Sequence, residues 1–147
     1  MSNSRRIHEL HAEGHALWRA GRIADAERAY RAMANEARAV DEVSDALRAD
    51  AHHWTAHFLR DTGKMQEAEA FARQAIALEE RAGRAVILAN HRMFLAQLLE
   101  GRGELREALA QAELALEAER AGMGADHTET RHYASVVTKL RQRLGEA

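Results

Sequence analysis

The apolar positions of this chain follow a helical spacing, and no stretch shows the sustained two-residue alternation of β-branched residues that is typical of strands. The last segment is the clearest example, with one apolar stripe formed by Tyr133, Val136, Val137, Leu140 and Leu144. Proline is absent, and the dominant residues (alanine, leucine, glutamate, arginine and glutamine) are good helix formers. The sequence therefore predicts an all-α protein.

A second pattern repeats around three turn glycines. Gly21, Gly63 and Gly103 are 42 and 40 residues apart. A leucine precedes each glycine by four residues, a small residue precedes it by seven, and an acid–alanine pair begins four residues after it. The matching residues are Leu17, Leu59 and Leu99, then Gly14, Ala56 and Ala96, and finally Ala26, Ala68 and Ala108. So many matches in one register indicate an internal repeat.

Each copy of the pattern predicts a helical hairpin that its glycine closes with a positive φ. Small residues let the two helices approach closely, and the leucines, together with Ile23, Met65 and Leu105, are expected to fill the space between them. A single hairpin cannot bury its apolar face, so the hairpins should stack in one domain over residues 1–147. The predicted helices span residues 5–20 and 23–40, 44–61 and 65–82, and 85–101 and 105–121.

A solitary helix is predicted over residues 126–144, where Asp126 and Glu129 match a capping box. Its apolar stripe is expected to cover the open end of the third repeat. The alternative is a homodimer contact through this helix, in which the chain serves as a scaffold. Two further histidines have structural interpretations: His52 is expected to pack between helices, and His127 to act as a linker or cap residue.

The repeated motif resembles that of the tetratricopeptide repeat (TPR) family. The usual repeat has about 34 residues, so the longer spacing here is similar to the long repeats of kinesin light chains, as is the segment Gly124-Ala125-Asp126-His127. Two features depart from the family: Leu10, His52 and Arg92 replace an early aromatic residue, and no proline ends a repeat. The resemblance implies a TPR-like α-α superhelix of three hairpins, with repeats over 5–40, 44–82 and 85–121 and a C-terminal capping helix.

The resemblance also implies where a partner binds. In this family the first helices of successive repeats lie side by side and line a concave groove, which here would take a peptide or a helix of another protein. Aromatic and methionine side chains in such a groove are natural anchors for a partner. The residues implied to contact the partner are His11, His15, His53, Trp54, His57, Asn90, Met93, Phe94 and Gln97.

The histidines leave open a second function, a metal- or small-ligand-binding protein and even an enzyme. His11/His15 and His53/His57 are pairs four residues apart, which places both rings of each pair on one helix face. Imidazole pairs of this kind bind divalent transition metals. If neighbouring helices bring the pairs together, Asp50 or Glu13 would be an added ligand or would hydrogen-bond a histidine ligand.

Composition and motifs exclude several other classes. The formal net charge is −2 and no basic block occurs, which argues against nucleic-acid binding. The chain has no cysteine, no signal peptide and no apolar run long enough for a membrane span, so a cytoplasmic protein is expected. Motifs for phosphate binding, serine hydrolases and zinc proteases are missing, so no catalytic residue and no cofactor are expected.

Overall fold

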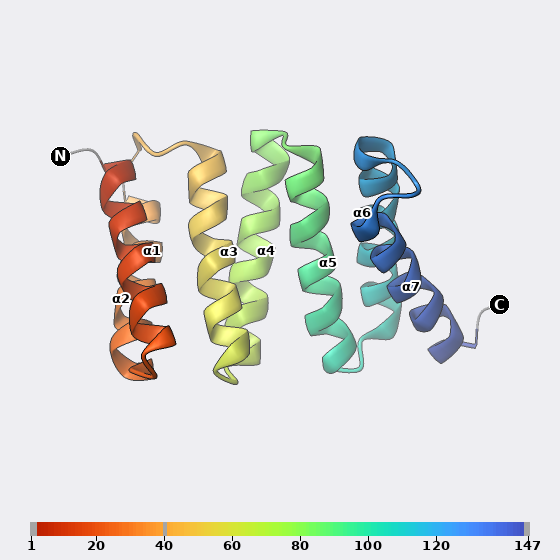
Figure 1. Cartoon of the computed structure of the whole chain (residues 1–147), viewed down its shortest axis with the longest axis horizontal. Helices are drawn as coiled ribbons and strands as arrows, with labels where there is room; N and C mark the ends of the chain where they lie inside the picture. Colours follow the sequence, from red (N-terminus) through yellow and green to blue (C-terminus); the bar gives the residue numbers. More distant parts are fainter. Residues whose placement is uncertain (1–2, 40, 146–147) are drawn as a thin grey trace. The chain divides into compact units, whose positions relative to one another are not determined.

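The computed structural model describes residues 3–39 and 41–145, and these residues form seven α-helices and no strand (Figure 1). The predicted all-α architecture is confirmed, and every predicted helix boundary lies within two residues of the observed one. The helices are α1 Asn3–Arg19, α2 Ile23–Ala39, α3 Asp45–Asp61, α4 Met65–Ala82, α5 Ala85–Gly101, α6 Leu105–Met123 and α7 Thr128–Arg143.

The chain divides into two compact units, Met1–Ala82 with α1 to α4 and Gly83–Ala147 with α5 to α7. In the first unit, α1 packs on α2 and α3 on α4, and α3 also contacts both α1 and α2. In the second unit, α5 packs on α6 and α6 on α7. A single domain over residues 1–147 stays a prediction.

The three repeat glycines close their helices in the same way. Gly21, Gly63 and Gly103 have φ values of 79°, 86° and 83°, a region that side chains other than glycine rarely adopt. After Gly63, the N–H of Lys64 donates to the carbonyl of Leu59 at 2.8 Å, and the N–H of Gly63 donates to Arg60 at 3.1 Å. The same pair of bonds recurs at the other two glycines, so each repeat turn is a Schellman motif and its leucine supplies an accepting carbonyl.

Replacing Gly63 by alanine is therefore expected to lower the free energy of unfolding by about 1–2 kcal/mol, because an added Cβ disfavours the left-handed conformation. Gly101 is a matched control, since a Cβ at either glycine would meet open space but Gly101 has no positive φ. Gly101→Ala should stabilise the protein slightly. Urea denaturation measures both changes, and equal effects at the two sites would contradict the role of φ.

Close helix approach in the first repeat depends on Gly14, where a Cβ would lie 2.9 Å from a ring carbon of Tyr30. The repeat alanines predicted to lie between helices are fully buried, as are Leu59 and Leu99. The expectation for Ile23 and Met65 was wrong, because these side chains are 40% and 54% exposed. Each is the first residue of its helix, and helical side chains lean toward the N-terminus, so they extend past the packed turns.

Helix α7 covers α6 within the second unit. Tyr133, Val137 and Leu140 of the predicted stripe are buried, which confirms the capping helix. The helix begins at Thr128, so its N-cap is His127, whose Nδ1 accepts from the backbone N–H of Glu129 at 3.2 Å. The predicted cap Asp126 was therefore wrong, since it lies one residue too early, whereas His127 as a cap residue is confirmed. The dimer alternative stays a prediction.

Candidate partner-binding face

Helices α1 and α3 of the first unit gather most of the predicted contact residues on one surface. Ser44 starts α3 by accepting the N–H of Leu47 on its Oγ at 3.1 Å, and Thr62 ends it by donating its hydroxyl to the carbonyl of Phe58 at 2.8 Å. These bonds fix where α3 begins and ends. We call this surface the histidine–tryptophan face; it consists of His8, His11, His15 and Trp18 of α1, and His53, Trp54 and His57 of α3.

Trp54 joins the two helices of this face. Its ring stacks on His11 with centroids 3.9 Å apart and an angle of 2° between the planes, and His8 lies 6.2 Å from it. His8 and His15 are exposed, whereas His11 and Trp54 are half-buried. Burial, followed by the nearby charges of His15 and His8, lowers the pKa of His11, and Asp50 opposes this shift. His11 is therefore a mainly neutral hydrogen-bonding and stacking group near neutral pH.

An aromatic core lies beneath the same face. The ring of Tyr30 in α2 stacks on that of Phe58 in α3, with centroids 4.8 Å apart. Trp18 of α1 contacts Phe58 edge-on, with ring centroids 5.3 Å apart. Tyr30 and Phe58 are buried, whereas Trp18 is half-buried. Burial raises the pKa of Tyr30 to about 12, so this phenol stays neutral. The core under the face is thus filled, and the imidazole and indole rings above it remain partly accessible.

His53 and His57 form a close pair on α3. Their Nε2 atoms are 3.1 Å apart, and an Nη2 of Arg60 lies 3.2 Å from Nδ1 of His57. Arg60 also donates through Nε to Asp61 at 2.8 Å. Because a guanidinium only donates, Nδ1 of His57 accepts, and the proton of its neutral ring is assigned to Nε2. That N–H then donates to Nε2 of His53, so the hydrogen bonds run from Arg60 through His57 to His53.

The two predicted histidine pairs do not converge on one site. Within the described part of the chain, no three of the five candidate ligands bring their donor atoms within 4.8 Å of one another. His11 and His15 are the looser pair, with ring centroids 6.4 Å apart against 4.5 Å for His53 and His57. The joint ligand set His11, His15, His53, His57 and Asp50 is thus not assembled, and metal binding itself stays untested.

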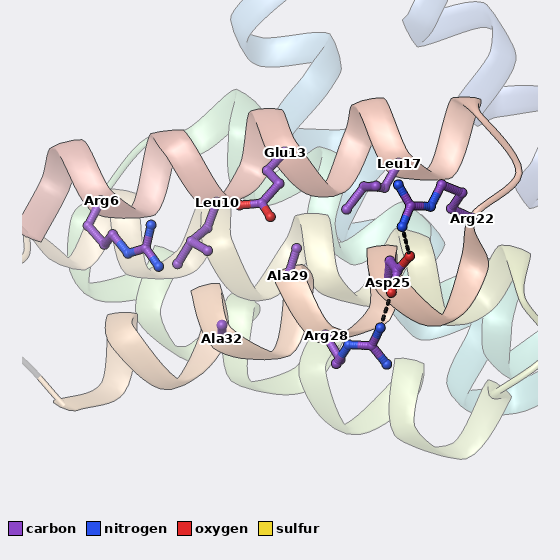
Figure 2. A pocket seen from close by; sticks show the side chains of 9 residues that line it. All are labelled: Arg6, Leu10, Glu13, Leu17, Arg22, Asp25, Arg28, Ala29 and Ala32. Atoms are coloured by element: carbon purple, nitrogen blue, oxygen red, sulfur yellow. Dashed lines mark hydrogen bonds and ion pairs between the residues drawn. The ribbon is translucent and has the colours of Figure 1, made fainter.

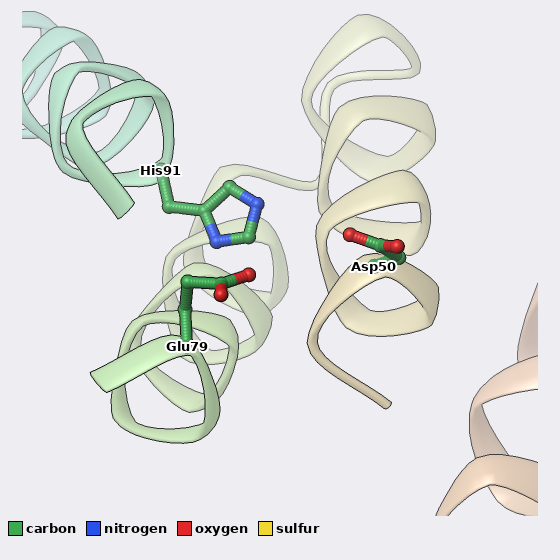
Figure 3. A group of neighbouring side chains, drawn as sticks. All are labelled: Asp50, Glu79 and His91. Carbon is green, nitrogen blue, oxygen red and sulfur yellow. The ribbon is translucent and has the colours of Figure 1, made fainter. Parts of the chain in front are cut away.

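Asp50 lies instead beside a carboxylate of α4. A carboxylate oxygen of Asp50 lies within 4.8 Å of a carboxylate oxygen of Glu79, and the Glu79 side chain is completely buried. Figure 3 shows these two side chains on their helices. His91, drawn in the same figure, belongs to α5 of the second unit. Asp50 therefore lies at the α3–α4 contact, and its charge also acts on His11, but it does not join two of the histidines in one ligand set.

The predicted contact residues of the second unit divide by exposure. Asn90 and Gln97 are exposed on α5, as a binding role requires. Met93 and Phe94 are only 3% and 4% exposed, so the expectation that they present accessible anchors was wrong. The reason is that α5 is apolar around most of its circumference, a pattern typical of a helix buried on several sides.

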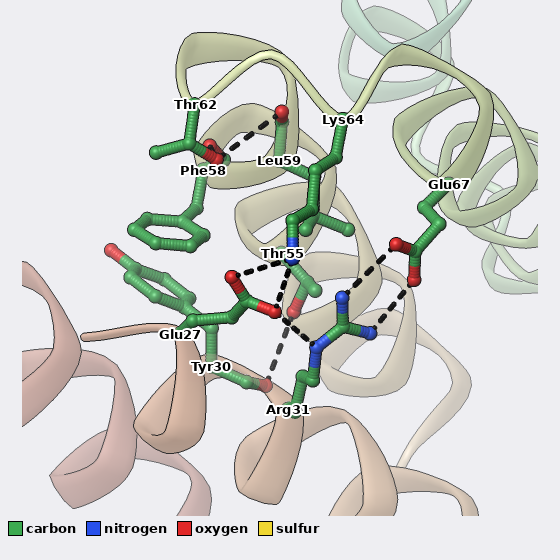
Figure 4. Close-up of polar contacts among 9 residues, drawn as sticks. All are labelled: Glu27, Tyr30, Arg31, Thr55, Phe58, Leu59, Thr62, Lys64 and Glu67. Atoms are coloured by element: carbon green, nitrogen blue, oxygen red, sulfur yellow. Dashed lines mark hydrogen bonds and ion pairs between the residues drawn. The ribbon is translucent and has the colours of Figure 1, made fainter. Parts of the chain in front are cut away.

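A salt-bridge network joins the first two hairpins (Figure 4). Its Glu27–Arg31 pair has the i,i+4 spacing of a helical ion pair, whereas its pairs between the hairpins have no signal in the sequence. Glu27 of α2 accepts from Lys64 in the repeat turn at 2.9 Å, and Arg31 of α2 bridges Glu27 and Glu67 of α4, also at 2.9 Å. Hydrogen bonds from Lys64 and Arg31 lower the pKa of Glu27, and the bond from Arg31 lowers that of Glu67. The network links α2 to the turn that follows α3 and to the start of α4.

A shallow pocket of about 430 Å³ lies between α1 and α2 (Figure 2). Asp25 forms ion pairs with both Arg22 and Arg28 at its rim. Asp25 and Glu13 together offset two of the three guanidinium charges in the lining, so the pocket offers an anionic ligand little net attraction and is a weaker candidate than the histidine–tryptophan face. Its lining residues are Arg6, Leu10, Glu13, Leu17, Arg22, Asp25, Arg28, Ala29 and Ala32.

Comparisons with known proteins identify the fold. No family model matches the sequence, and no curated protein is significantly similar to it. Among solved structures, the nearly identical TPR-like repeats of a kinesin-light-chain-type protein from Podosopora anserina match with a TM-score of 0.82 and 17% identity, covering 99% of this chain and 69% of that one. The fold is tetratricopeptide-like.

Two further structures extend this TPR likeness. BtubC (BKLC) from P. vanneervenii has a TM-score of 0.83 and 17% identity over 96% of this chain, which spans 56% of BtubC. The TPR2B domain of yeast Sti1, solved in a complex with pHsp70, has a TM-score of 0.73 and 17% identity, with 95% of this chain and 98% of the domain covered. None of the described helices is long and apolar enough to cross a membrane.

Proposed function

We propose that the histidine–tryptophan face binds a short peptide segment of another protein. The observation that carries this proposal is the half-buried His11–Trp54 stack between α1 and α3, which lies over an already filled aromatic core. Rings that are not needed to complete a core yet remain partly accessible are suited to contact a partner. The TPR-like fold supports the same function, since Sti1 TPR2B was solved in a complex with pHsp70.

The chemistry of the face suits a peptide with both polar backbone groups and an apolar side chain. Indole and imidazole N–H groups donate to backbone carbonyls, and neutral imidazole nitrogens accept from backbone N–H groups. The flat surface of the His11–Trp54 stack takes an apolar or aromatic side chain. His8 and His15, both exposed, flank the stack along α1 and add hydrogen-bonding groups at either end.

The test uses a peptide taken from a captured partner. The full chain is immobilised, bound proteins are recovered from the native lysate, and the protected fragment is synthesised for calorimetric titration. Trp54→Ala should weaken binding of this peptide about tenfold or more, as expected for an interface hot spot. The free energy of unfolding should fall by only about 1–2 kcal/mol, because Trp54 is half-buried.

Met65→Ala provides the control, because Met65 is an exposed apolar residue of α4 outside the histidine–tryptophan face. This variant should bind the peptide as the unmodified chain does. The proposal would be wrong if the unmodified chain and Trp54→Ala bound the peptide with equal affinity. It would also be wrong if Met65→Ala lost more affinity for the peptide than Trp54→Ala.

A further inference from the structure

We propose that His53 and His57 form a two-histidine chelate for a divalent transition metal ion, with Cu²⁺ bound most tightly. The site is confined to α3 and uses neither His11 nor His15. It does not depend on the proposed peptide binding, since the chelating atoms are already close in the chain alone.

The separation of the two Nε2 atoms matches adjacent positions on a metal ion. With metal–nitrogen bonds of about 2.05 Å, a nitrogen–nitrogen distance of 3.1 Å corresponds to a nitrogen–metal–nitrogen angle of about 98°. That angle lies between the right angle of tetragonal sites and the tetrahedral angle. Imidazole nitrogens in tetragonal sites favour Cu²⁺ and Ni²⁺, and Cu²⁺ leads the general order of affinity.

The two rings are already close to one another and are not fully buried. The ring planes are inclined at 84°, with centroids 4.5 Å apart, and both side chains are half-buried. No third histidine or carboxylate in the described residues joins the pair within 4.8 Å. The remaining coordination positions would therefore be taken by water or by a donor atom of a bound partner, as in metal sites that keep open positions.

Arg60 is expected to weaken metal binding at this pair. Its Nη2 donates to Nδ1 of His57 at 3.2 Å, which keeps the ring proton on Nε2, one of the two chelating atoms. Metal binding must move that proton to Nδ1, and the hydrogen bond from Arg60 is then lost. The guanidinium charge also repels the cation. Removing Arg60 should therefore strengthen metal binding, whereas removing either histidine should weaken it.

The experiment is a calorimetric titration of Cu²⁺ into the full chain after treatment with a chelator, repeated with Ni²⁺ and Zn²⁺. One equivalent should bind first, with affinity in the order Cu²⁺, Ni²⁺, Zn²⁺. His53→Gln and His57→Gln should each lower the affinity for that metal ion about tenfold or more, because only one of the two imidazole ligands would remain. Electron paramagnetic resonance of the first Cu²⁺ equivalent should show coupling to two imidazole nitrogens.

His11→Gln is the matched control, because His11 and His15 have the same spacing but lie farther apart, with centroids at 6.4 Å. This substitution should leave the affinity for the first equivalent of Cu²⁺ unchanged. Arg60→Gln should raise the affinity several-fold, a gain that misfolding cannot produce. The proposal is overturned if His53→Gln and His57→Gln bind the first equivalent normally, if His11→Gln reduces binding as much, or if Arg60→Gln weakens it.

Discussion

Replacing Phe58 by alanine is expected to lower the free energy of unfolding by about 3–5 kcal/mol, the usual cost of removing a core aromatic side chain. Phe58 is fully buried and contacts both Tyr30 and Trp18, so one residue of α3 holds rings from α1 and α2. Its loss leaves a cavity and also removes the stacking energy of the two ring pairs. Urea denaturation, followed by circular dichroism, measures the change.

The control for this prediction is Met65→Ala, which removes an apolar side chain that is mostly exposed. Its free energy of unfolding should stay within about 0.5 kcal/mol of the unmodified value. A loss of less than about 1 kcal/mol for Phe58→Ala would show that the Tyr30–Phe58–Trp18 cluster is not the core of the first unit.

The second large effect is a loss of stability on acidification, caused by His52. This side chain is 2% exposed, and burial, together with the charges of Arg38 and Arg48, lowers its pKa to about 4. The unfolded chain takes up this proton near its ordinary pKa of about 6.5, whereas the folded chain resists it down to about pH 4. Stability from His52 is therefore complete above pH 6.5 and is lost as pH falls toward 4, by about 3 kcal/mol in all.

Denaturation between pH 7 and pH 4, with a chelator present, tests this prediction. His52→Gln removes the titrating group. The free energy of unfolding of this variant should therefore fall by about 3 kcal/mol less between pH 7 and pH 4 than that of the unmodified chain. His132→Gln is the control for replacing a histidine by glutamine at an exposed position, because His132 is exposed on α7. Parallel pH profiles for His52→Gln and the unmodified chain would contradict the role of burial.

The helix boundaries could be predicted because the repeat pattern has a local physical cause. The glycine and the leucine four residues before it are two positions of one Schellman motif, as Gly63 and Leu59 show. Small residues between the helices, such as Gly14, are likewise required by the contact they make. His52 as an interhelical residue and His127 as a cap residue were also correct.

Other features could not be predicted because they depend on packing between distant segments. The burial of Met93 and Phe94 follows from a helix that is apolar on several sides, whereas the expected groove assumed one buried side only. Arg31 and Glu67 are 36 residues apart, and no local pattern pairs them. Spacing alone also made the His11/His15 and His53/His57 pairs look equivalent, although only the second pair is close.

The central claim is that a partner peptide binds on the histidine–tryptophan face of the first unit. The chain has two tryptophans, Trp18 and Trp54, and both lie on this face, so their indole N–H signals in a ¹H–¹⁵N NMR spectrum report on it directly. Titration with the captured peptide should shift both indole signals, with the larger change at Trp54, and leave the backbone signals of α7 in place. The claim would be contradicted if, at saturating peptide, other signals shifted while both indole N–H signals stayed in place.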